Sequence, residues 1–281
     1  MGLAKIRDER FWVTIRKTLD GTRRKDAIVE EMPTLQAATT TELPIWIDPC
    51  PILEVVAEIR FQTQLPPQAV AGVVYSAMRD EFPRMVTLPA ASIPFEARAV
   101  DPNLKYQPEH RLEGNRGVVL VGPQHVTIGP RSVPYPGWPA LLREFETIVA
   151  LLTPRDLLQT ADRFGLRYVN FFRENILPRL TLSLTIAERP ITELGTFFRT
   201  IMTDRPCKLL LQVGSGMALT TNPAEIGSTI DIDSYVESPQ LTRDLGPTFS
   251  AFLAEAHAAE KRLFFSLLSP ELLRSLNPRY A

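Results

Sequence analysis

An alternation of apolar and polar positions marks the segment from Pro51 to Phe61 as a β-strand. Its sequence reads PILEVVAEIRF, and every second residue from Leu53 onward is apolar. The intervening positions are Glu54, Val56, Glu58 and Arg60. Because successive side chains of a strand point to opposite faces, this pattern predicts one face packed in a core and one face that carries charge.

The segment from Phe164 to Phe172 (FGLRYVNFF) predicts a second strand of the same kind. In a strand, Arg167 shares its face with Val169 and Phe171, whereas Tyr168 points the opposite way. Both segments are apolar enough for a core, so their charged side chains must either face water or be paired.

Other periodic segments predict helices and short strands, separated by turns rich in proline and glycine. Apolar residues spaced by three or four positions predict helices over 67–82, 138–152, 191–202 and 241–267, with a short final helix over 270–276. Short apolar runs predict strands at 93–100, 106–113, 118–121, 126–128, 180–187, 208–213 and 229–236. We interpret Gly214-Ser215-Gly216 as a hairpin turn between two strands.

Two successive units of strand, helix, strands and helix predict an α+β fold, with antiparallel sheets covered by helices and two loosely related halves. We expect three regions in the chain. Residues 1–47 lack sustained periodicity and form a flexible or extended N-terminal arm, 48–178 form the first α+β half, and 179–281 form the second half with the long C-terminal helix.

Composition narrows the class of protein. A formal net charge of -1 and a pI near 6.4 argue against nucleic-acid binding through bulk charge. Cys50 and Cys207 lie far apart, and we interpret them as reduced thiols. No apolar run approaches the ~18 residues that span a bilayer, and the N-terminal residues contain no signal-peptide core. We therefore expect a soluble, cytoplasmic protein that does not insert into a membrane.

Acidic residues provide a candidate metal site. Asp231 and Asp233 would lie on one face of a strand about 7 Å apart, with Glu237 nearby, close enough to share Mg²⁺ or Ca²⁺. The competing interpretation, which the pattern favours, is the solvated outer face of an amphipathic strand. Zinc-like spacing is absent among the histidines, which are His110, His125 and His257.

Catalytic and cofactor motifs give no comparable signal. No G-x-S-x-G, G-x-G-x-x-G or P-loop sequence occurs. Glu260 and Lys261 follow His257 by three and four positions, a helical spacing that would orient an imidazole as a general base. Because no nucleophile is marked, we interpret His257 as an exposed helix histidine. The sequence leans against an enzyme and predicts no cofactor.

Arginine and aromatic residues, the side chains that grip phosphates and stack bases, interleave between Arg155 and Arg179. The favoured interpretation is structural, with an arginine of one predicted strand paired to a carboxylate of its neighbour. The carboxylates considered are Glu54 and Glu58. If these groups bind a ligand instead, the candidate binding residues are Arg60, Arg167, Tyr168, Glu54 and Glu58.

Several motifs occur in order along the chain: PILEVVAEIRF, Phe82-Pro83, Trp138 leading through a helix to FGLRYVN, and HAAEKRLFFSLLSPEL. Together they resemble a sporadically distributed bacterial family of uncharacterised proteins that shares the strand motifs P-I-x-E-V-V-x-E-I-R-F and G-L-R-Y-x-N. The resemblance extends from Pro49 to Leu276, so residues 1–47 lie outside it. The family has no assigned activity. Its patchy occurrence, typical of genes on mobile elements, implies a defence or toxin–antitoxin setting.

A well-patterned fold without ligand clusters or catalytic motifs favours a non-enzymatic protein-interaction module, which binds a protein partner or associates with itself. The alternative is a nucleic-acid-binding or metal-dependent nucleic-acid-processing protein. That protein would use the arginine and aromatic stretch, and it would hold its metal at Asp231 and Asp233.

Overall fold

The computed structural model describes residues 42–102, 104–152, 157–219, 222–239 and 245–281. Most of the predicted arm at 1–47 therefore lies outside the described residues. Its last part packs against the C-terminal segment, where the backbone N–H of Ile45 donates to the carbonyl of Arg279 at 2.7 Å. Ile47 is buried in the core. This end of the predicted arm is thus part of the folded body.

A nine-stranded sheet, antiparallel throughout, forms the centre of the fold. In spatial order its strands are β2 (Arg84–Thr87), β3 (His110–Gly114), β4 (Gly117–Gly122), β5 (His125–Pro130), β1 (Ile52–Gln62), β6 (Thr160–Phe172), β11 (Asn222–Glu237), β10 (Cys207–Leu219) and β9 (Phe197–Asp204). A separate two-stranded sheet contains β7 (Thr185–Ile186) and β8 (Arg189–Pro190).

The chain leaves the two central strands in a similar way. β1 and β6 pair with each other. After β1 the chain forms β2, β3 and β4 and comes back as β5, which pairs with the edge of β1 that β6 leaves open. After β6 it likewise comes back, so that β11 pairs with the free side of β6. Each returning strand leads to a long helix, α4 (Trp138–Ala150) or α5 (Leu245–Leu267). The two segments thus share a topology while they build one continuous sheet.

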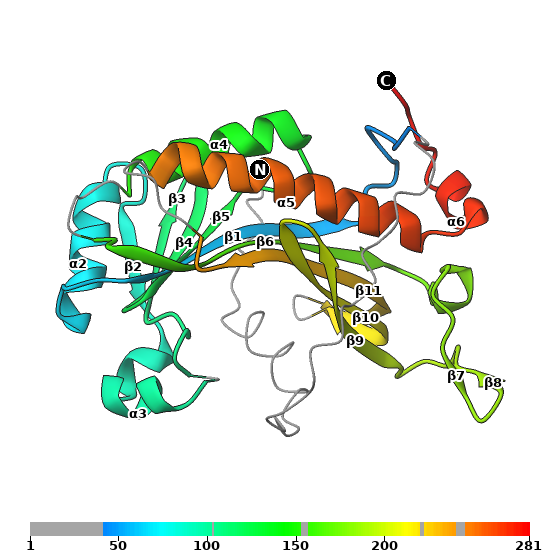
Figure 1. Ribbon diagram of the computed structural model, residues 1–281, viewed down its shortest axis with the longest axis horizontal. Coiled ribbons are helices and arrows are strands. Elements are labelled where there is room, and N and C mark those ends of the chain that lie inside the picture. The colour runs from blue at the N-terminus through cyan, green and yellow to red at the C-terminus, as the bar shows by residue number, and fades with distance from the viewer. Residues whose placement is uncertain (1–41, 103, 153–156, 220–221, 240–244) are drawn as a thin grey trace.

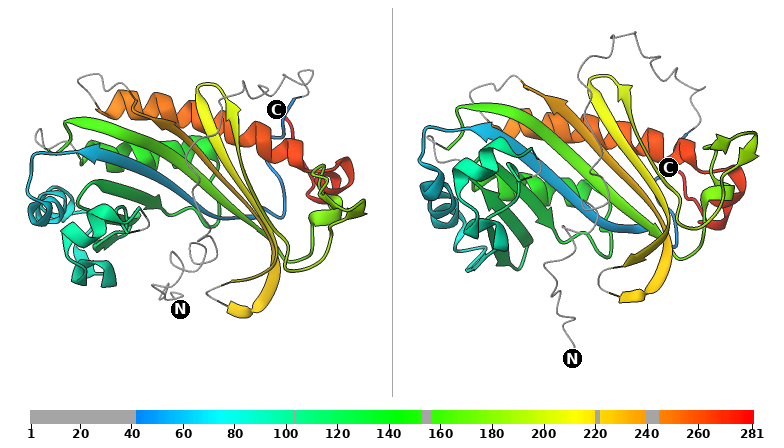
Figure 2. Two further views of the ribbon diagram at one scale, coloured as in Figure 1. Left: turned by 60° about the horizontal axis from the view of Figure 1, so that its bottom comes forward. Right: turned by 90° about the horizontal axis from the view of Figure 1, so that it is seen from below.

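Helices cover one face of this sheet (Figure 1). α5 packs against β6, β10 and β11, α4 packs against β5 and α5, and α2 (Pro67–Met78) packs against β4. Seen from below, the strands lie in front of α4 and α5 (Figure 2). The predicted α+β class is therefore confirmed.

The core forms between the helices and the sheet. Phe164 of β6 meets Phe249 of α5 edge to face, with ring centroids 4.9 Å apart. Aromatic side chains bury the most area per residue, and truncating one in a packed core costs about 3 to 5 kcal/mol. The inward face of β1, beginning with Val55, is fully buried as its alternation predicts.

Short elements complete the fold at its two ends. η1 (Pro89–Ser92) and α3 (Phe95–Val100) follow β2, whereas η2 (Leu177–Arg179) follows β6 and α6 (Pro270–Ser275) follows α5. The last helix begins with a side-chain cap, because the hydroxyl of Ser269 accepts a hydrogen bond from the backbone N–H of Leu272 at 3.1 Å.

The segment predicted as a helix over 191–202 is mostly an edge strand, β9. Gly195 has a φ of 87°, a left-handed conformation that interrupts a helix. From Phe197 onward, the residues pair with β10 in an unbroken register. Phe198 and Met202 pack against the core while Ile201 is exposed, so the side chains follow a period of two. The prediction was wrong because cross-strand pairing outweighs helical spacing in so short a segment.

Three further local predictions were wrong. The strand predicted at 93–100 is mostly the short helix α3, which follows Pro94, a residue whose fixed φ suits the start of a helix. The triplet Gly214-Ser215-Gly216 lies inside β10, where Gly216 has a φ of 71° beside a register shift. It therefore forms a β-bulge and not a hairpin turn. Residues 180–187 hold β7 and one isolated bridge in place of a full strand.

Candidate functional site

The central strands β1 and β6 place the predicted site residues on opposite faces of the sheet. Arg60, Glu54, Glu58 and Arg167 lie on the face that α4 and α5 do not cover. Tyr168 is buried on the helix-covered face, where it belongs to the core. The alternation of side chains explains this separation, because Tyr168 and Arg167 are adjacent in the strand. The predicted binding residues therefore do not converge on one site.

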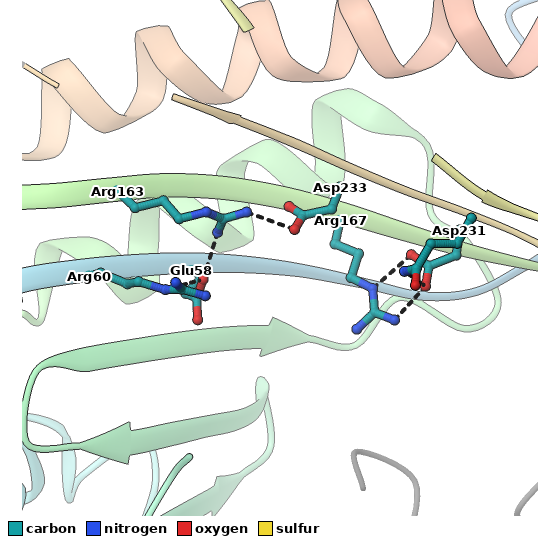
Figure 3. Close-up of polar contacts among 7 residues, drawn as sticks. Glu58, Arg60, Arg163, Arg167, Asp231 and Asp233 are labelled. Carbon is teal, nitrogen blue, oxygen red and sulfur yellow. Dashed lines mark hydrogen bonds and ion pairs between the residues drawn. The ribbon is translucent and has the colours of Figure 1, made fainter. Parts of the chain in front are cut away.

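A charged cluster occupies the face of the sheet without the long helices, and Figure 3 shows its side chains. It consists of Glu58, Arg60, Arg163, Arg167, Asp231 and Asp233. Arg163 joins two strands, since its guanidinium donates to Glu58 at 2.6 Å and to Asp233 at 2.7 Å. Arg60 donates to the same oxygen of Glu58 at 2.9 Å.

The second part of the charged cluster is the pair of Arg167 and Asp231. In the strand register Arg167 lies opposite Asp233, yet its guanidinium reaches diagonally to Asp231. Two hydrogen bonds join them, at 2.7 Å from Nε and 2.5 Å from Nη2. Gln212 donates to the same carboxylate at 3.1 Å. Bidentate arginine–carboxylate pairs of this kind are the stronger ion pairs in proteins.

Burial and ion pairing compete in setting the protonation of the cluster. Burial raises the pKa of Glu58, but Arg163 and Arg60 together outweigh burial and lower it to about 2. Burial also acts to lower the pKa of Arg167, and Asp231 outweighs it, so that this pKa is raised. Both groups therefore stay charged at neutral pH.

Both arginines of the predicted ion pairs, Arg60 and Arg167, are paired, but not as predicted. Arg60 does pair with Glu58, but along the same strand and not across to a neighbour. Arg167 pairs with Asp231. Glu54 forms no ion pair among the described residues, and its pKa rises to about 7, chiefly through burial, with Arg167 acting against the rise. The partner of Arg167 was missed because the register of β6 against β11, which sets this pairing, cannot be read from the sequence.

Asp231 and Asp233, the predicted metal pair, both accept hydrogen bonds from arginines. Arginines within ion-pair distance neutralise the charge that would attract a cation. Within the described ranges, no group of three or more His, Cys, Asp or Glu residues is placed to hold a metal ion. The geometry gives the metal hypothesis no support, and it stays a prediction.

A cavity of about 490 Å³ lies on the other side of the sheet, between α5, the start of α4 and the segment that leads into β1. Its walls are mostly apolar and aromatic, with a few polar side chains. The lining residues are Pro44, Ile45, Trp46, Ile47, Cys50, Ile52, Tyr135, Gly137, Trp138, Pro139, Tyr168, Asn170, His257, Glu260, Lys261, Phe264 and Phe265.

His257 and Tyr168 form the polar centre of the cavity wall. The Tyr168 hydroxyl lies 2.9 Å from Nδ1 of His257, and the imidazole stacks on Trp138 with ring centroids 4.0 Å apart. Burial lowers the pKa of His257 to about 3, and Lys261 acts in the same direction. The imidazole is therefore neutral at pH 7, and in that state Nδ1 either accepts from or donates to the tyrosine hydroxyl, according to the tautomer. The interpretation of His257 as an exposed histidine was wrong, because this side of α5 faces the sheet.

Glu260 lies one helical turn beyond His257 on α5 and is only 5% exposed. No hydrogen bond or ion pair joins its carboxyl group to another described residue. Burial raises its pKa to about 8, and the opposing effect of Lys261 is smaller. A buried acid that lines a cavity without a partner is unusual, since most buried acids are paired.

Sequence reasoning noticed the spacing of His257 and Glu260 but not their burial. A usable signal was present, because Ala256, Ala259 and Leu263 put apolar residues on the same side of the helix. The position of Trp138 at the start of α4 carried no signal that it would stack on His257.

Comparisons with protein-family models, with curated proteins and with solved structures found no match to this chain. Among the described residues, no helix has the length and apolar character needed to cross a bilayer.

Proposed function

We propose that this chain is a non-enzymatic binding protein whose cavity takes a small, largely apolar molecule. The single observation that carries the proposal is the 490 Å³ cavity, walled by aromatic residues and holding Tyr168, His257 and Glu260 at one side. Pockets for small ligands have volumes of about 300 to 1,000 Å³, apolar walls and a few placed polar groups.

Two titratable side chains of the cavity wall, His257 and Cys50, are poorly suited to catalysis. A general base works best when its pKa lies near the operating pH, whereas the pKa of His257 is lowered to about 3 by burial. Cys50 lines the cavity, but burial raises its pKa, so the reactive thiolate is scarce at neutral pH. These two side chains are therefore poorly suited to act as base and nucleophile.

Cys50 offers a direct test of the cavity, because it lines the wall whereas Cys207 is fully buried. We expect N-phenyl-1-naphthylamine, a neutral dye, to become fluorescent on binding the native protein. We also expect N-ethylmaleimide at pH 8 to modify one thiol, to react more slowly when the dye is bound, and to abolish dye binding once Cys50 is labelled. Peptide mass spectrometry identifies the labelled cysteine.

The matched control is Cys50→Ala, which should bind the dye before and after the same treatment. If the native protein gives no dye signal, the cavity does not bind apolar molecules and the proposed function is wrong. Labelling of Cys50 with full retention of dye binding would place the dye elsewhere.

A second candidate function is the protein-interaction module. The supporting observation is β9, which is the end strand of the sheet and pairs only with β10 among the described residues. Ile201, a residue of this strand, is 45% exposed. End strands accept an added strand from a partner or from a second copy. Copurification with the product of a neighbouring gene, reduced by Ile201→Lys, tests this function. Membership of the bacterial family, a cytoplasmic location and a defence or toxin–antitoxin setting stay predictions that accompany this hypothesis.

The nucleic-acid alternative has less support. Three arginines of the charged cluster face three carboxylates, so the cluster brings little net charge to a phosphate backbone. Gel shifts with single-stranded RNA and DNA at two salt concentrations, with and without Mg²⁺, test this alternative. Retention or cleavage would favour it over the binding protein.

A further inference from the structure

We propose that the molecule bound in the cavity is an organic cation, an amine or quaternary ammonium with an apolar body, whose nitrogen lies at the carboxyl group of Glu260. This inference rests on the proposed function and names the class of ligand.

The first argument is the carboxyl group of Glu260. Glu260 is only 5% exposed to solvent, and it lines the cavity. Lys261 is its neighbour in the chain, but no ion pair joins the two side chains. Carboxylates in protein interiors are normally paired or hydrogen-bonded. A positively charged group inside the cavity would supply the partner that the described protein does not.

The second argument is the set of aromatic rings that line the same cavity. Trp138 stacks on His257 in one part of the wall, and Trp46 stacks on Tyr135 in another, with centroids 6.3 Å apart. Phe264 and Phe265 also line the cavity. The faces of such rings attract cations, most strongly where water is excluded, and aromatic walls are the usual surroundings of bound quaternary ammonium groups.

The third argument is the charge of the other lining side chains. Among the residues that the structure describes, no arginine lines the cavity, and Lys261 is the one cationic side chain of its wall, half-buried with a pKa that burial lowers. His257 is neutral, so it does not oppose a cation. An anionic ligand would lie against Glu260 with only Lys261 to balance it. The cavity is therefore complementary to a positive charge.

Proton release gives a readout on the unmodified protein. A cation at Glu260 favours the ionised carboxylate, so binding at pH 7 should release part of a proton, whereas a neutral ligand should release none. The other titratable groups facing the cavity are Cys50, Tyr135, Tyr168, His257 and Lys261. Tyrosine and cysteine pKa values here are raised by burial, and that of His257 is about 3, so these side chains keep their protons unchanged near pH 7. Burial lowers the pKa of Lys261, and the loss of proton release in Glu260→Gln distinguishes the carboxyl group from this amine.

The test uses two probes of the same shape, phenyltrimethylammonium and the uncharged tert-butylbenzene, which displace the neutral dye from the full-length protein. We expect the wild type to bind the cation at least about tenfold more tightly, as one cation–π contact and one charge pair suffice for that ratio. Glu260→Gln should lower the ratio, because the charge pair is lost while the ring contacts remain, and leave tert-butylbenzene binding unchanged. The matched control Glu255→Gln, an exposed position of the same helix, should keep the wild-type ratio.

Calorimetric titrations in two buffers of different ionisation enthalpy measure the released proton without any substitution. Equal affinity for the two probes, an unchanged ratio in Glu260→Gln, or cation binding without proton release would each overturn the inference. In those cases the dye still binds, and the proposed function stands. Absence of dye binding would instead refute the proposed function itself.

Discussion

Replacing Arg167 with methionine is expected to lower the free energy of unfolding by about 3 to 5 kcal/mol. Asp231 is 3% exposed and receives two hydrogen bonds from this guanidinium. Without Arg167, the carboxylate keeps only the amide of Gln212 as its hydrogen-bond partner in the described structure. The cost arises because a buried charge is left without its counter-charge. Urea denaturation followed by circular dichroism at pH 7 measures the change.

The matched control is Arg173→Met, which removes the ion pair with Glu225 just beyond the same strand. The side chain of Arg173 is 84% exposed, so we expect a loss below about 1 kcal/mol. The double variant Arg167→Met with Asp231→Leu should recover much of the lost stability, because no unpaired charge remains. An Arg167→Met protein that unfolds at the wild-type urea concentration would show that the charged cluster does not stabilise the fold.

Replacing Glu260 with glutamine is expected to change how stability depends on pH, by up to about 4 kcal/mol. The folded pKa is about 8, whereas the ordinary value is 4.5, so between these values the folded state binds more protons than the unfolded state. The wild type therefore loses stability as the pH rises from about 5 through 8. Glutamine does not titrate, so the variant lacks this loss and is the more stable protein at pH 9.

At pH 5 the two proteins should unfold within about 1 kcal/mol of each other, because the carboxyl group is then neutral in the folded state. Glu54, with a pKa of about 7, titrates in both proteins and cancels in the difference. Glu255→Gln serves as the control and should follow the wild type at every pH. If the free energies of unfolding of wild type and Glu260→Gln differ by the same amount from pH 5 to 9, the acid is not buried as described.

These experiments address two separate sites, which lie on opposite faces of the sheet. The charged cluster holds three strands of the sheet together, and its effect should appear as stability. The cavity lies between the sheet and the helices, and its effect should appear as ligand binding. A loss of binding in Arg167→Met while the protein is still folded would show that the two faces are coupled.

Much of the fold could be predicted from alternation alone. The strand at Pro51 to Phe61 and the burial of Val55, Ala57 and Ile59 follow from a period of two, which is a local property of the chain. The helices that became α2, α4 and α5 were also predicted, since each carries an apolar stripe of several turns. Short segments such as β9 and α3 were assigned wrongly, because a few residues fit either period.

The site residues were harder to predict because their roles depend on partners. The sequence placed Arg167 and Tyr168 on opposite faces, and the structure agrees. It did not identify Asp231 as the partner of Arg167, because the register of β6 against β11 sets that pairing. It also treated His257 as exposed, whereas this residue is half-buried. A signal for the covered side was nevertheless present, since Ala256, Ala259 and Leu263 put apolar residues on the same side of α5 as His257.

By itself, the sequence determined the class of fold and the central strands, because the spacing of apolar residues marks strands and helices locally. It also determined the charge of the face without the long helices, because the side chains of odd-numbered and even-numbered residues in a strand point to opposite faces. The tertiary structure alone decided that Glu260, His257 and Trp138 line one cavity. Those residues come from two helices more than a hundred positions apart, and no local pattern encodes how two helices pack across a sheet. The burial that changes the protonation of Glu260 and His257 arises only in that packing.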